Sequence, residues 1–343
     1  MHELVKKLCS ANAPSGCEYA VIHIITKRLD KLNVPYVKYP SGNVIASLIS
    51  GKSYAPRIMV QCHVDEVGFM VKGHRDGGYL SLSPLGISDV KYLVGKRVTL
   101  LADTPVSGSI GAVPIHLSKD KDLPSMDDLY ADVGFTDSDI ADLNVPLGTF
   151  GCFDTDLKYF GKDSSFISGK ALSSRIPCAI MLEVIQRLKN VSLDVNLCFA
   201  FTVRGNLSLC GAAEAYKNVF PDVVISVSGI SANDTPDITS PICRLGHGAA
   251  ISKGETRYRF ATSVPAQLCA VAESNGISTQ LSRPMTDDED RNFDVIRMKN
   301  AGARLATVML PVRNIRSSCE SVAKSDVNAV ADLLCVAVPL LEV

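Results

Sequence analysis

The second half of the chain alternates between apolar strands and amphipathic helices, and this order restricts the fold more than any other feature. Helices are predicted at 174–189, 208–219, 265–275, 294–300 and 325–338, and strands at 194–203, 222–227, 278–281 and 304–310. Such alternation is typical of a sheet with helices packed on its faces. The sequence therefore predicts an α/β fold for this part of the chain.

The first part of the chain is expected to belong to the same fold, and it is followed by a stretch with a different pattern of predicted elements. Two helices, a strand hairpin across Ser41 and Gly42, and a strand ending at His63 are expected within residues 1–72. Between residues 73 and 162, short strands are separated by Gly and Pro, with short helical elements around 125–132 and 137–143. We expect an α/β domain formed by residues 1–72 plus 163–343, interrupted by an inserted β-rich domain at 73–162.

Composition excludes several classes of partner and compartment. The formal net charge of −1 predicts no binding to nucleic acid or to an anionic membrane. No apolar run approaches the roughly 18 residues that a membrane-spanning helix needs, and the N-terminus lacks the apolar core of a signal peptide. The 11 cysteines are scattered without CxxC pairs, so we expect reduced thiols in a cytoplasmic protein.

The strand that ends at His63 presents a histidine and a carboxylate together. His63 and Asp65 are separated by one residue, and both side-chain types are ordinary zinc ligands. A dinuclear hydrolase also needs a bridging carboxylate, further ligands and a separate carboxylate base, and strand ends of an α/β sheet are where such groups gather. Adjacent strand residues point to opposite faces, so Cys62 is not expected to act with His63 as a nucleophile and base.

Several segments together resemble the tetrahedral (TET) dinuclear-zinc aminopeptidases, a family that includes glutamyl and deblocking aminopeptidases and cellulase M. The resemblance covers nearly the whole chain and rests on residues 57–71, 127–135, 169–175, 201–208, 225–236 and 311–318. It implies a phosphorylase/hydrolase-like zinc-peptidase sandwich, interrupted by a small β-barrel-like (PDZ-like) domain that serves dimerisation. It also implies two zinc or cobalt ions in the family, and homo-oligomers from a dimer up to a dodecamer.

At the positions where the resemblance places the chemistry, this sequence has other residues. The bridging aspartate corresponds to Ser173, the general base to Gly205, and the later ligands to Asn206, Ser228 and Arg316. Asn292 stands where the family usually has an aspartate near the site. Of the family's metal ligands only His63 remains, with the motif residue Asp65 behind it.

These replacements predict a degenerate site that holds no metal cofactor. Ser and Asn are poor zinc ligands, and the guanidinium of Arg316 would repel a nearby dication. We expect His63 to be a residual, weak ligand, no residue to be catalytic, and Arg316 to form an ion pair with the buried Asp65 in the former metal pocket. The acidic run at 286–290 is an alternative source of ligands, although such runs are usually solvated.

The expected function is that of an aminopeptidase-family protein that has lost zinc-dependent peptide hydrolysis. Such a chain would act as a noncatalytic subunit, together with an active paralogue, or as a peptide-binding scaffold. Two alternatives stay open, namely an active metallo-aminopeptidase with one atypical metal at His63 and Asp65, and a non-enzymatic assembly protein. Tight zinc binding at neutral pH would favour the first alternative, and co-purification with an intact paralogue would favour the subunit role over the second.

Overall fold

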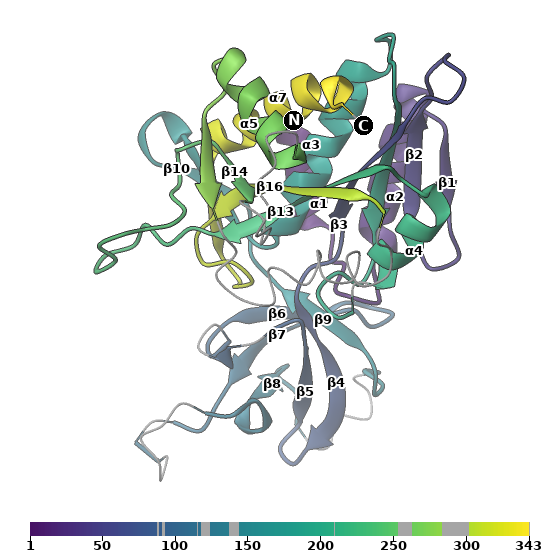
Figure 1. The fold of residues 1–343 in the computed structure, drawn as a ribbon. Coiled ribbons are helices and arrows are strands. Elements are labelled where there is room, and N and C mark those ends of the chain that lie inside the picture. Colours follow the sequence, from purple (N-terminus) through teal and green to yellow (C-terminus); the bar gives the residue numbers. More distant parts are fainter. Residues whose placement is uncertain are drawn as a thin grey trace.

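The chain folds into an α/β part that carries both termini and a β-barrel that projects from it (Figure 1). The computed structural model describes residues 1–342 except 88, 91–92, 115, 118–123, 137–143, 209, 253–262 and 283–301. The expected helices at 137–143 and 294–300, the acidic run at 286–290 and Asn292 lie outside the described residues.

An eight-stranded mixed sheet forms the centre of the α/β part, in the order β1-β2-β12-β3-β13-β16-β14-β15. Its strands are β1 (Tyr36–Lys38), β2 (Val44–Leu48), β3 (Arg57–His63), β12 (Asn196–Thr202), β13 (Val223–Ser231), β14 (Ala249–Ser252), β15 (Thr279–Ser282) and β16 (Arg304–Val312). The neighbouring strands β12, β3, β13 and β16 run parallel, whereas β2 and β14 are antiparallel to their neighbours in this group. The carboxyl ends of the parallel strands therefore meet at one edge of the sheet.

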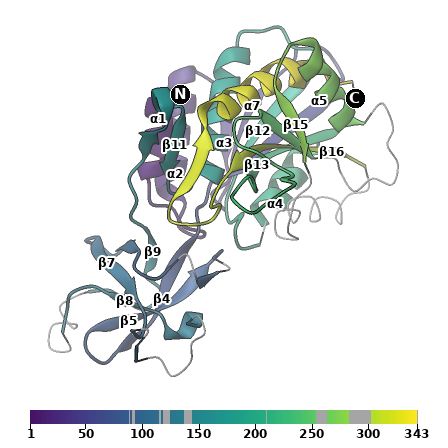
Figure 2. The same ribbon diagram turned by 90° about the vertical axis from the view of Figure 1, so that its left-hand side faces the viewer.

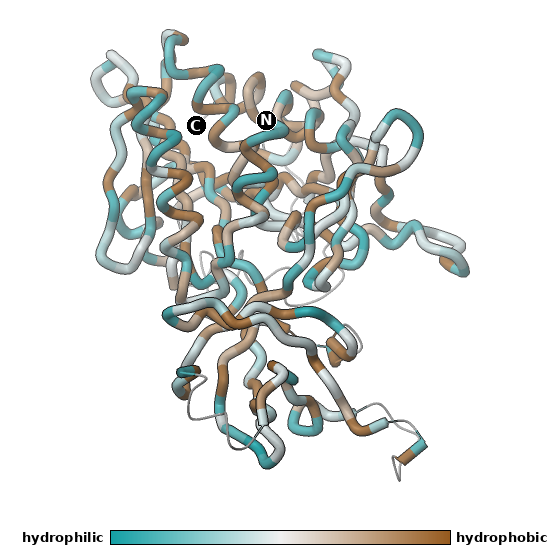
Figure 3. The backbone as a smooth tube through the Cα atoms, turned by 180° about the vertical axis from the view of Figure 1, so that it is seen from behind, coloured by the Kyte–Doolittle hydropathy of each residue, from teal (hydrophilic) through white to brown (hydrophobic). Residues whose placement is uncertain are grey.

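Helices cover both faces of this sheet. One face carries α1 (His2–Ser10), α2 (Tyr19–Leu32), α3 (Leu172–Leu188), α5 (Val264–Ser274) and α7 (Lys324–Ala337), and the other carries α4 (Cys210–Val219). Along β3, Val60 and Cys62 face the larger core while Met59 faces the α4 side, as the alternation of a strand requires. Figure 3 shows alternating hydrophilic and hydrophobic bands along the outer helices, which is the pattern of helices that bury one side.

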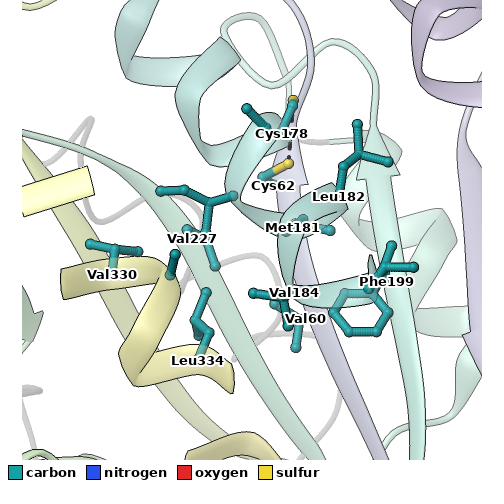
Figure 4. Close-up of a cluster of buried hydrophobic side chains, with 14 of the residues drawn as sticks. Val60, Cys62, Cys178, Met181, Leu182, Val184, Phe199, Val227, Val330 and Leu334 are labelled. Atoms are coloured by element: carbon teal, nitrogen blue, oxygen red, sulfur yellow. Dashed lines mark hydrogen bonds between the residues drawn. The ribbon is translucent and has the colours of Figure 1, made fainter. Parts of the chain in front are cut away.

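The long helix α3 supports the strand that leads to the candidate site. Figure 4 shows its side chains Cys178, Met181 and Val184 packed beside Val60 and Cys62 of β3. The thiols of Cys62 and Cys178 are 3.5 Å apart in this core. Cys62 therefore points away from the strand face that carries His63, as its position in the strand predicts.

The inserted part is a closed barrel with its own core (Figure 2). Its strands are β4 (Gly68–Arg75), β5 (Tyr79–Leu85), β6 (Arg97–Leu100), β7 (Val106–Gly111), β8 (Tyr130–Asp132) and β9 (Phe150–Phe153), in the order β4-β5-β8-β7-β6-β9. Closure leaves no free sheet edge. Inside, the rings of Phe69 and Phe153 meet edge to face with centroids 5.2 Å apart.

The structure shortens the helical element expected around 125–132. Only a 3₁₀ turn forms, at Met126–Asp128, because Ser125 and Asp128 close a capping box over this one turn. The chain then enters β8, which pairs with β5 and β7. The hydrogen-bonding partners offered by the barrel thus override the local helical preference.

A small sheet returns the chain from the barrel to α3. It is formed by β10 (Lys158–Phe160), β11 (Phe166–Gly169) and β17 (Glu320–Ala323), all antiparallel. The barrel strands run from Gly68 to Phe153, so they begin slightly before the expected boundary at residue 73. The limits of the two domains, 1–72 plus 163–343 and 73–162, stay a prediction. Within the described ranges, no helix is both long and apolar enough to cross a membrane.

Candidate functional site

A pocket lies at the carboxyl ends of the central parallel strands. This is where the sequence predicts that the site residues gather. It is lined by His63, Asp65, Glu66, Val67, Ala171, Ser173, Ser174, Asn206, Ser228, Gly229, Ile315, Arg316 and Glu320. Its volume is about 40 Å³. Five segments that are distant in sequence thus meet in one place, as the resemblance implies.

The carboxylate of Asp65 is completely buried and receives hydrogen bonds on both oxygens. Oδ1 accepts from the backbone N–H of Gly205 at 2.7 Å and faces Nδ1 of His63 at 3.2 Å. Oδ2 accepts from the backbone N–H and the side-chain amide of Asn206, at 2.8 and 2.9 Å, and from the hydroxyl of Ser15. We call these donors the Asp65 shell.

The Asp65 shell keeps this buried carboxylate ionised. Burial alone would raise the pKa of Asp65, but the hydrogen bond and charge of His63, the Ser15 hydroxyl and the Asn206 N–H hold that pKa well below its usual range. Oriented N–H and O–H groups therefore supply the compensation that a buried negative charge needs.

Arg316 is absent from the direct hydrogen-bond partners that the structure describes for Asp65, and the expected pairing of the two residues stays a prediction. Arg316 is half-buried and lines the pocket, and its backbone N–H donates to Oε1 of Glu320 at 2.7 Å. Arg316 lines the pocket, as the sequence predicts. The sequence did not predict that backbone N–H groups would donate hydrogen bonds to Asp65.

Glu320, at the start of β17, is a second buried carboxylate at the pocket, and sequence reasoning missed it. Its Oε1 accepts from the hydroxyl of Ser173 at 2.8 Å, and its Oε2 accepts from the Ser173 N–H at 2.6 Å. Burial raises the pKa of Glu320, although the N–H groups of Ser173 and Arg316 oppose this shift. Ser173, which the resemblance places at the bridging-aspartate position, is therefore hydrogen-bonded to a protein carboxylate.

Glu66, which also lines the pocket, joins the N-terminal loop to the segment that begins α3. Its carboxylate accepts from the N–H of Ala13 at 2.8 Å and lies 3.0 Å from both Lys170 Nζ and Arg175 Nη2. Burial would raise the pKa of Glu66, but the charges of Lys170 and Arg175 hold it below its usual value. This network ties the N-terminal loop to α3.

The resemblance places Gly205 at the general-base position, and the structure leaves no room for a side chain there. A Cβ atom built on Gly205 would lie 2.3 Å from Cβ and 2.6 Å from Cγ of His63. The preceding residue, Arg204, has a φ of +58°, so the turn itself is shaped to bring the Gly205 N–H to Asp65. Gly86 of the barrel, with φ +75°, packs as closely on Asn206, where a Cβ would lie 2.6 Å from the Asn206 Cβ.

The described donors do not fit a dinuclear metal centre. Such a centre needs several anionic or imidazole ligands with free lone pairs. The oxygens of Asp65 accept from protein donors, Glu66 is paired with two cations, and Glu320 accepts from Ser173 and from the Arg316 N–H. His63 offers one ring nitrogen, since the other faces Asp65. In the part of the chain that the structure describes, no group of three or more His, Cys, Asp or Glu side chains is arranged to hold an ion.

The close packing of Gly205 on His63 predicts the effect of a single methyl group. Gly205→Ala should lower the free energy of unfolding by about 1–3 kcal/mol, because the Cβ must displace the imidazole or the turn that binds Asp65. Gly51→Ala is the matched control, since a Cβ at Gly51 meets nothing within 4 Å. Urea unfolding followed by circular dichroism measures both, and equal midpoints for the two variants would contradict the geometry.

The lowered pKa of Asp65 predicts how stability depends on pH. The folded-state pKa lies below the ordinary value of about 3.9, so Asp65 contributes stability at higher pH that is lost as the pH falls toward the folded-state pKa. Asp65→Asn should cost about 2–4 kcal/mol at pH 7, and its deficit should shrink below about pH 4. Asp194→Asn, whose side chain is 69% exposed, is the control. A deficit for Asp65→Asn that is the same at pH 7 and pH 3 would argue against the shell.

The chain is similar to known aminopeptidases over nearly its full length. It is 29% identical to FrvX of Escherichia coli strain K12, a protein named as an aminopeptidase, over 97% of this chain and 93% of that protein. It is 25% identical to the lysyl aminopeptidase of Pyrococcus furiosus, over 95% of this chain and 93% of that protein.

Solved structures agree with the fold. The TET aminopeptidase of a marine-sediment Thaumarchaeota archaeon has a TM-score of 0.91 and 25% identity, covering 100% of this chain and 96% of that one. The TET1 peptidase of Pyrococcus horikoshii, which assembles into a tetrahedron or a large octahedral shell, has a TM-score of 0.83 and 24% identity, covering 98% of each chain. The model of the M42 glutamyl aminopeptidase family matches residues 42–333, and the chain therefore belongs to this family.

Proposed function

We propose that this protein has kept the M42 fold and its pocket but has lost zinc-dependent peptide hydrolysis, and that it acts as a noncatalytic subunit or a peptide-binding scaffold. The observation that carries the proposal is the Asp65 shell, because it uses both oxygens of the retained motif carboxylate in protein hydrogen bonds. A carboxylate held in this way orients His63 without needing a cation.

Gly205 supports the same proposal, because a glycine has no side chain that could act as the general base. A positioned general base contributes about 10²–10⁴-fold to a hydrolytic rate. A Cβ at Gly205 would clash with His63, and this supports a pocket that is packed around glycine. Restoring a glutamate at that one position would disturb His63 as well as add a base.

Assembly is the second part of the proposal. We propose a homo-oligomer in which the inserted barrel serves dimerisation, and an active paralogue is the natural hetero-partner for a noncatalytic subunit. The TET relatives support an oligomer, and Val94, Val113, Leu117 and Leu147 place exposed apolar side chains on the barrel. In this proposal these side chains are buried against another chain of the oligomer.

An active metallo-aminopeptidase with an atypical or single metal is the second candidate. The relatives named as aminopeptidases, similar over nearly the whole chain, favour it. In this case His63 and Asp65 would hold the metal, with the ring nitrogen of His63 that does not face Asp65 as one ligand. A non-enzymatic assembly role unrelated to peptides remains the third candidate.

A turnover assay separates these candidates. With unblocked aminoacyl anilides and added zinc or cobalt, we expect hydrolysis at the background rate. Gly205 has no side chain to act as a general base, and the described side chains do not fit two metal ions. Asp65→Asn and His63→Ala should not change this background. Turnover that both substitutions abolish, while Asp194→Asn leaves it intact, would establish the metallo-aminopeptidase instead.

A further inference from the structure

A row of polar side chains crosses one face of the central sheet from β3 to β15. The registers of β3, β13, β16, β14 and β15 place one polar residue of each strand beside the next. We call these side chains the polar row, namely Gln61, Ser226, Thr307, Ser252 and Ser282. Val60 and Cys62, on either side of Gln61, point into the core beneath α3, so the row lies on the face of the sheet that carries α4.

The polar row is buried and incompletely hydrogen-bonded. Each of its residues is at most 6% exposed. Within the described part of the chain, Oε1 of Gln61, Oγ1 of Thr307 and Oγ of Ser282 have no hydrogen-bond partner. The amide of Gln61 donates to Oγ of Ser226 at 3.3 Å. Buried polar atoms in native proteins nearly always have a partner, so these three atoms indicate a bound molecule.

The chemistry of the polar row restricts that molecule to a small neutral one. Hydroxyl groups and a carboxamide donate and accept hydrogen bonds but carry no charge. An ion bound there would lose its hydration without gaining an opposite charge from the row. A row that is at most 6% exposed is also closed to a larger solute. Water is the molecule that meets both conditions.

The spacing of the strands also suits water. Neighbouring strands lie roughly 4.8 Å apart, so serine and threonine side chains on adjacent strands face one another across about this distance. Two hydrogen bonds of roughly 2.8 Å that meet at a tetrahedral water oxygen span about 4.5 Å. One water can therefore bridge two neighbouring hydroxyl groups. Buried waters typically make about three hydrogen bonds to polar groups that otherwise have no partner.

We propose that ordered water molecules bind along the polar row and form a buried line across the sheet. The line begins behind the pocket, because Gln61 precedes His63, and Ser226 precedes Ser228, by two residues on the same strand face. It ends at Ser282 on the edge strand β15. The bound water thus hydrates, from within the protein, the part of the sheet that supports His63 and Ser228. This site does not depend on whether the pocket is catalytic.

A high-resolution crystal structure of the full-length protein tests the proposal. We expect ordered water within hydrogen-bond distance of Oε1 of Gln61, Oγ1 of Thr307 and Oγ of Ser282. Thr307→Val should lose the water bound at residue 307, whereas Thr307→Ser, which keeps the hydroxyl, should retain it. Protein atoms bonded to all three of these atoms, a larger bound molecule, or no water at any of them would each overturn the proposal.

The melting temperature gives a second, independent readout. If the Thr307 hydroxyl binds water, Thr307→Val deprives that water of a partner and should lower the melting temperature by roughly 1–3 °C. If the hydroxyl has no partner, the same substitution removes an unsatisfied buried group and should raise the melting temperature. Thr202→Val is the matched control, because the Thr202 hydroxyl donates to the backbone oxygen of Cys62 at 3.1 Å and its loss should lower the melting temperature in either case. A melting temperature of Thr307→Val at or above that of the wild type would contradict the proposal.

Discussion

The hydrogen bonds that stabilise one buried, ionised carboxylate, Asp65, organise the end of the molecule that contains the pocket. Its donors come from the N-terminal loop through Ser15, from the end of β3 through His63, and from the turn after β12 through Gly205 and Asn206. Charge-assisted hydrogen bonds of this kind are stronger than neutral ones. The same contacts that keep Asp65 ionised therefore hold three separate segments at one edge of the sheet.

This chain shares the fold of its M42 relatives, and we propose that its chemistry differs from theirs. The strand order, the helices on both faces and the inserted barrel agree with the TET aminopeptidase structure. At the pocket, however, Gly205 packs directly on His63, and Ser173 is bound by Glu320. The side chains of the site are thus packed on and hydrogen-bonded to one another. Function depends on such a site and not on the fold alone.

The sequence predicted the elements whose formation depends on local pattern. The apolar run before His63 forms β3, and the helical spacing of apolar residues from Ser174 forms α3. The resemblance brought His63, Ser173 and Arg316 to one pocket. It could do so because aligned strand ends meet at the same edge of a parallel sheet.

What the sequence could not predict depends on contacts between distant segments. Ser15 carries no motif that marks it as a partner of Asp65, and Glu320 begins a short strand whose pairing is set by β11. A sequence shows which side chains can approach a charge, but not which backbone N–H groups reach it, so the N–H donors of Gly205 and Asn206 to Asp65 were not predicted. The 3₁₀ turn before β8 differs from the expected helix for a similar reason, since barrel pairing decides it.

The metal content of the protein purified without chelator tests the central claim most directly. If the Asp65 shell replaces a cation, elemental analysis should find less than roughly one tenth of a zinc or cobalt ion per chain, and the melting temperature should be the same with and without EDTA. Near-stoichiometric metal that is lost in His63→Ala, together with a lower melting temperature in EDTA, would contradict the account.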